Sequence, residues 1–77
     1  MKNKEKVLQI LSEIKPTKDM TNVENIIEGG YLDSFELMML ISRLSDEFGI
    51  EIGIDDIVPE NFNSAEAITD MVERLLK

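Results

Sequence analysis

The sequence has 77 residues, a formal net charge of -8, and neither histidine nor cysteine. A chain this short makes one domain, expected over residues 1–77, with no room for a second core or a sizeable active-site cavity. It lacks the usual general base, the usual thiol nucleophile and most zinc ligands, so we predict that it is not an enzyme and has no metal site.

The first predicted helix runs from about Asn3 to Ile14. Proline cannot continue a helix and disfavours helical geometry in the residue before it, so Pro16 sets the end. The apolar stripe of this helix is Val7, Leu8, Ile10, Leu11 and Ile14. Lysines lie outside that stripe, as expected for the solvent face of an amphipathic helix.

A long loop is predicted from Thr17 to Leu32, because no apolar period is sustained there. Turn-forming residues alternate with three apolar anchors, which are Val23, Ile26 and Ile27. Gly29-Gly30 marks a turn, and the segment 23–27 is where a helical turn can form within the loop.

The second predicted helix begins at about Ser34. Asp33 followed by Glu36 has the spacing of a capping box, in which each side chain accepts a hydrogen bond from the backbone of the other residue. Gly49 can take the left-handed conformation that closes a helix. The residues expected on the buried side are Leu37, Leu40, Ile41, Leu44 and Phe48.

Outside that stripe, the same helix carries Phe35, Met38, Met39 and Ser42, where a solvent face would normally be polar. An exposed apolar cluster usually marks a partner surface, and methionine packs against several shapes. The alternative is that Met38 belongs to the margin of the core and that Phe35 folds back under the preceding loop. The spacing favours neither.

A short helical turn is predicted next through residues 57–58, capped by Asp55 and Asp56, with Pro59 closing it or starting the following turn. In the last helix, Asn63 is the expected cap and Glu66 the partner in a second capping box. Its stripe is Ile68, Met71, Val72, Leu75 and Leu76. The chain is therefore all-α, with three long helices and one short one.

Ser34 has two interpretations. Serine and aspartate are common at helix starts for capping alone. An exposed hydroxyl at a helix N-terminus also lies where backbone N–H groups and the helix dipole stabilise an attached phosphate.

Residues 29–52 together resemble the phosphopantetheine attachment site of acyl and peptidyl carrier proteins. That family has an Asp-Ser-Leu-like triplet opening its second helix, and the triplet here is Asp33-Ser34-Phe35. Residues 59–68 are similar to the junction between the third and fourth helices of many carriers. The resemblance covers essentially the whole chain and implies a four-helix carrier bundle with a long loop between the first two helices.

The resemblance implies that a phosphopantetheinyl transferase attaches 4'-phosphopantetheine from coenzyme A to Ser34, with Asp33 as the acidic neighbour. The chain would then be a stand-alone acyl or aminoacyl carrier whose cargo is a thioester on that arm. Its partners would be a loading ligase and downstream synthases or transferases with basic patches. The residues expected to contact partners are Phe35, Glu36, Met38, Met39, Ser42, Asp46 and Glu47.

The chain departs from the pattern of carriers in fatty-acid synthesis. Position 39 is methionine where those carriers usually have an acidic residue, and the third residue of the triplet is Phe35 instead of leucine. Ser42, Arg43 and Ser45 stand where that pattern tends to be apolar or acidic. These differences favour a specialised polyketide, nonribosomal peptide or D-alanyl pathway, without ranking the three.

The net charge and the hydropathy of the chain limit its expected cellular location and the kinds of partner that it can bind. Residues 19–73 hold fourteen carboxylates against the single basic residue Arg43, which disfavours nucleic-acid binding and favours basic partners. No apolar run reaches membrane-spanning length, and we expect a cytoplasmic monomer. The competing hypothesis is an unmodified acidic helical module that docks through Met38 and Met39, with Ser34 only a cap.

Overall fold

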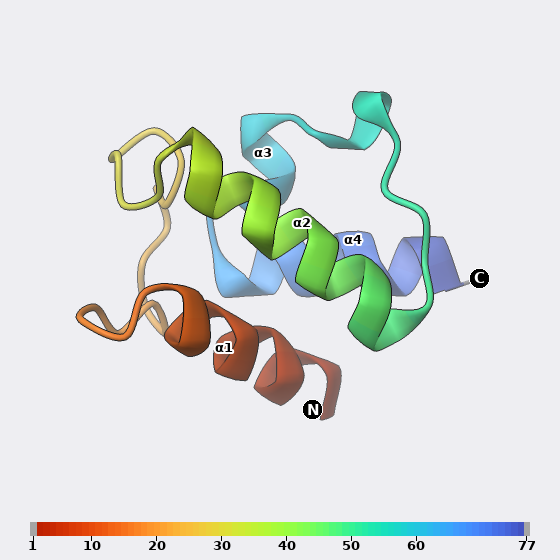
Figure 1. Cartoon of the computed structure of the whole chain (residues 1–77), viewed down its shortest axis with the longest axis horizontal. Helices are drawn as coiled ribbons and strands as arrows, with labels where there is room; N and C mark the ends of the chain where they lie inside the picture. The colour runs from red at the N-terminus through yellow and green to blue at the C-terminus, as the bar shows by residue number, and fades with distance from the viewer. Residues whose placement is uncertain (1, 77) are drawn as a thin grey trace.

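The computed structural model describes residues 2–76 and has three long helices (Figure 1). They are α1 (Lys2–Ile14), α2 (Ser34–Phe48) and α4 (Ala65–Leu76). Between α2 and α4 lie a 3-10 turn, η1 (Ile54–Asp56), and the one-turn helix α3 (Pro59–Phe62). The predicted all-α bundle is confirmed, and the described residues contain no strand.

The core lies where the long helices meet. α1 packs against both α2 and α4, and α3 packs against α4. Leu40 and Leu44 bring the buried side of α2 into this core, while Leu37, Ile41 and Phe48 are partly buried at its edge. The predicted stripes of all three helices therefore face inward, apart from Leu76, which is exposed. No helix within residues 2–76 combines the length and the apolar character needed to cross a bilayer.

The long loop connects the end of α1 to the start of α2 around one end of the bundle (Figure 1). Ile26 is fully buried, as its predicted role as an anchor requires, and Met20 and Leu32 are buried as well. The chain turns at residues 26–30, where Gly30 has a positive φ of 73°. Gly29-Gly30 thus forms the predicted turn immediately before α2.

The helical turn predicted around residues 23–27 forms slightly later, at residues 25–29, where the Gly29 N–H donates to the Asn25 carbonyl at 2.6 Å. The backbone N–H of Ile26 donates to the carbonyl of Asn63, and the N–H groups of Ile27 and Glu28 donate to the Asn63 side-chain oxygen. The first N–H groups of a helical turn have no partner within the turn, and Asn63 accepts hydrogen bonds from these three.

The two predicted caps in the second half of the chain were wrong. Asp55 and Asp56 lie inside η1, whose N-cap is Gly53, and the Asp56 carboxylate accepts a 3.1 Å hydrogen bond from the Gly53 N–H. At α4 the capping side chain is Ser64, which accepts a 3.0 Å hydrogen bond from the Ala67 N–H. Asn63 does not cap α4, because its side chain is bonded to the long loop.

Candidate functional site

The first turn of α2 is closed by the predicted capping box. The Asp33 carboxylate accepts a 2.7 Å hydrogen bond from the Glu36 N–H, and the Glu36 carboxylate accepts a 3.0 Å hydrogen bond from the Asp33 N–H. Asp33 itself is extended, with φ of -86° and ψ of -179°, so the helix begins at the next residue. At the other end, Gly49 has a φ of 63° and closes α2 in the left-handed conformation, as predicted.

Ser34 is the first residue of α2 and is exposed to solvent. The positive end of the helix dipole and the N–H groups of the first turn lie at this position, so negative charge added to the hydroxyl is stabilised there. A phosphoester therefore fits at Ser34. A serine hydroxyl is a weak nucleophile without a base, and the sequence has no histidine or cysteine. The Ser34 hydroxyl is therefore accessible to solvent but has no imidazole or thiolate beside it.

The lysine that directly follows α1 reaches the capping box. Lys15, directly after the end of α1, places its ammonium 3.4 and 3.3 Å from the two carboxylate oxygens of Glu36. The Lys15 side chain is 33% exposed and that of Glu36 is 20% exposed, so this ion pair is better shielded than one on an open surface. Glu36 thus connects Lys15 to the backbone of Asp33. This contact between the first two helices was not predicted from the sequence.

Phe35, Met38 and Met39 point into solvent beside Ser34. Their exposed fractions are 72%, 63% and 40%, so Phe35 does not fold under the loop and Met38 does not belong to the core margin. Ser42, one turn further along, is also exposed. These residues therefore form an exposed apolar cluster and are not part of the core margin. We call Phe35, Met38 and Met39 the α2 apolar patch.

The acidic residues predicted to face partners have different environments. Glu47 lies near the end of α2 and forms an ion pair with Lys6 of α1 at 3.5 Å. Asp46 beside it is exposed. Arg43 pairs with Glu13 of α1, and the hydrogen bond from Arg43 holds the pKa of Glu13 below its ordinary value. Several charges of α2 are therefore balanced by α1.

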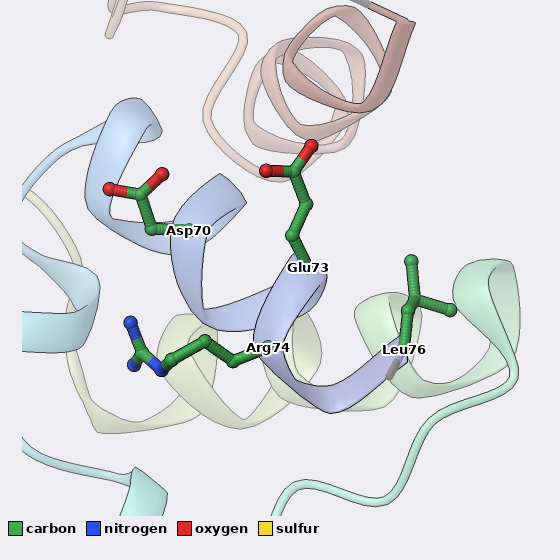
Figure 2. A pocket seen from close by; sticks show the side chains of 4 residues that line it. All are labelled: Asp70, Glu73, Arg74 and Leu76. Carbon is green, nitrogen blue, oxygen red and sulfur yellow. The ribbon is translucent and has the colours of Figure 1, made fainter.

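Two hollows in the structure differ in the side chains that line them. An apolar recess of about 230 Å³ lies between α2, α3 and the segment before α3, lined by Ile27, Leu37, Ile57, Val58, Pro59 and Phe62. A second hollow, of about 540 Å³, lies on α4 and is shown in Figure 2. Among the described residues, its lining side chains are Asp70, Glu73, Arg74 and Leu76 of α4, which form no nucleophile–base pair. Within residues 2–76 no cluster of acidic side chains has the arrangement of a metal site.

Comparison with known proteins agrees with this geometry. A family model described as "Phosphopantetheine attachment site" matches residues 5–72. The D-alanyl carrier protein of Enterococcus faecalis is 31% identical over 77 residues, which cover 97% of this chain and 99% of that protein. The matched region contains α2, the capping box and both flanking connections.

Proposed function

Since the chain belongs to the phosphopantetheine-attachment family of carrier proteins, we propose that Ser34 is the residue that carries the 4'-phosphopantetheine arm. Carriers of this family are not enzymes, and the absence of histidine and cysteine is consistent with that role. The observation that supports Ser34 most strongly is its position as the exposed first residue of α2, directly after the Asp33 cap.

In the attachment step, the Ser34 oxygen forms an ester bond to the phosphorus that bears the pantetheine arm of coenzyme A. The phosphoanhydride bond of coenzyme A breaks, and the nucleotide part leaves with its remaining phosphates. The transferase supplies the base that accepts the hydroxyl proton. The N-terminus of α2 stabilises the charge of the new phosphodiester. The arm supplies a thiol, on which cargo is held as a thioester.

The proposed cargo is a D-alanyl group. The D-alanyl carrier protein of Enterococcus faecalis aligns with this chain over nearly the full length of both proteins. This comparison favours the D-alanyl pathway among the three specialised pathways that the sequence left unranked. We place the carrier in the cytoplasm, where coenzyme A and ATP are available to its transferase and its loading ligase.

The α2 apolar patch is the proposed docking surface for these enzymes. It lies on the same first turns as Ser34, so an enzyme seated on it is close to the arm. Glu36 and Glu47 already pair with Lys15 and Lys6, whereas Asp46 is exposed near the far end of the helix. Docking should therefore depend more on Phe35, Met38 and Met39 than on Glu36 and Glu47, while Asp46 and Ser42 contribute polar contacts at the edge.

Intact-mass measurement tests the cargo. The chain is incubated with coenzyme A and a broad-specificity phosphopantetheinyl transferase, and then with ATP, a D-alanine ligase and either D- or L-alanine. We expect the mass of one arm, followed by one alanyl group with D-alanine only. Trypsin should leave the arm on the peptide of residues 19–43, where fragmentation distinguishes Ser34 from Ser42. Modification without D-alanyl loading would retain the carrier function and overturn the cargo.

A further inference from the structure

Three anionic groups would meet at the start of α2 once Ser34 is modified. Asp33 and Glu36 lie on either side of Ser34 in the capping box, and their carboxylates already accept hydrogen bonds from that turn. A phosphodiester adds one further negative charge between them. The helix N-terminus is equivalent to only about half a positive charge, so it does not balance this group alone.

Lys15 is placed to supply the missing positive charge. Its ammonium contacts both oxygens of Glu36, and one of those oxygens also accepts the Asp33 N–H. Lys15 is held in place because its own N–H donates to the carbonyl of Leu11, which continues the hydrogen-bond pattern of α1 past its last residue. The backbone of Lys15 is therefore fixed by α1, and its ammonium is held by the two contacts with Glu36.

We propose that Lys15 is a positioning residue for the modification of Ser34. It holds the Glu36 carboxylate in the closed capping box and compensates the charge that the phosphodiester brings to this turn. The inference rests on the proposed function, because it concerns the same hydroxyl. Lys15 lies 19 positions before Ser34 and meets the site only through the packing of α1 on α2.

Lys6 offers a matched control. It lies on α1, whereas Lys15 directly follows that helix, and it also pairs with a glutamate of α2, at 3.5 Å from Glu47. Glu47 is eleven positions after Glu36, about 16 Å along the helix axis. Lys15→Met and Lys6→Met each remove one lysine from an α1–α2 ion pair, but only Lys15→Met affects the capping box.

The test compares the melting temperatures of the unmodified and modified forms of the wild type, Lys15→Met and Lys6→Met. Both substitutions should lower the melting temperature of the unmodified chain slightly. Modification should then lower the melting temperature of Lys15→Met by about 2–4 °C more than it lowers that of the wild type. Lys6→Met should show no such additional decrease. Equal changes on modification in the two variants would overturn the role of Lys15.

Two further measurements separate positioning from general stability. Amide hydrogen exchange at Asp33 and Glu36 should be faster in Lys15→Met than in Lys6→Met, because the capping box opens more often. The kcat/KM of modification should fall about two- to fivefold in Lys15→Met and recover in Lys15→Arg. Unchanged exchange and an unchanged rate would overturn the inference, whereas a wild type that is never modified would overturn the proposed function itself.

Discussion

Asn63 bonds to Glu28 in two ways across the bundle. Its side-chain oxygen accepts the Glu28 N–H at 3.2 Å, and its side-chain nitrogen donates to the Glu28 carboxylate at 3.3 Å. The same oxygen accepts the Ile27 N–H at 3.0 Å. One side chain at the α3–α4 junction therefore fixes the loop that leads, through Gly29 and Gly30, to Ser34.

Asn63→Ala should lower the free energy of unfolding by about 1–2 kcal/mol, because the partly buried Ile27 N–H loses its partner. Urea denaturation measures this change. Asn22→Ala, at an exposed position of the same loop, serves as the control and should change stability by no more than about 0.5 kcal/mol. Equal effects of the two substitutions would show that Asn63 does not hold the loop.

Asp33→Ala removes the cap of α2 and should cost about 0.5–2 kcal/mol of stability. Asp46→Ala removes the same charge from an exposed position near the other end of the helix, where a carboxylate is not favoured by the dipole. It should be neutral or slightly stabilising. Denaturation midpoints of the two variants compare the positions directly, and an unchanged midpoint for Asp33→Ala would contradict the capping box.

Met38 and Met71 provide a comparison between surface and core. Met71 is fully buried, so Met71→Ala should destabilise the chain by about 2–5 kcal/mol. Met38 is 63% exposed, and Met38→Ala should leave stability nearly unchanged. If the α2 apolar patch is the docking surface, Met38→Ala should instead raise the KM for modification or loading. A variant with wild-type KM values would exclude Met38 from that surface.

Acid should weaken the link between Glu13 and Arg43. The pKa of Glu13 is lower in the folded chain than its ordinary value of 4.5, chiefly because Arg43 donates a hydrogen bond to it. This interaction therefore stabilises the fold above that pH and is lost as pH falls through the folded-state pKa. The stability difference between wild type and Arg43→Met should shrink below about pH 4.5.

Arg74→Met is the control for that pH dependence. Arg74 donates to the side-chain oxygen of Asn61, which does not titrate. The effect of Arg74→Met on thermal stability should thus stay nearly constant over the same pH range. A difference for Arg43→Met that does not change with pH would contradict the assigned role of the ion pair.

The elements that the sequence predicted well are those with local signals. Asp33 and Glu36 are three residues apart, and Gly49 directly follows the last apolar residue of α2, so cap, box and helix end could all be identified within one segment. The exposure of Ser34 could be predicted from the same signals, because they place this residue at the start of α2. The stripe of α2 has the period of a helix and needed no knowledge of its neighbours.

The wrong prediction for the cap of α4 shows that local sequence signals are not sufficient everywhere. Asn63 and Ser64 are adjacent and both can cap a helix. The choice depends on Ile27 and Glu28, more than 30 positions earlier, which bind the Asn63 side chain. The contact of Lys15 with Glu36 was missed for a similar reason, because it requires the angle and register at which α1 packs against α2.

The most direct test of carrier function is the intact mass of three chains after incubation with coenzyme A and a broad-specificity phosphopantetheinyl transferase. The chains are the wild type, Ser34→Ala and Ser12→Ala, the last removing an exposed serine of α1. We predict that the wild type and Ser12→Ala each gain one phosphopantetheine and that Ser34→Ala gains none. A gain by Ser34→Ala, or no gain by the wild type with several transferases, would contradict attachment at Ser34.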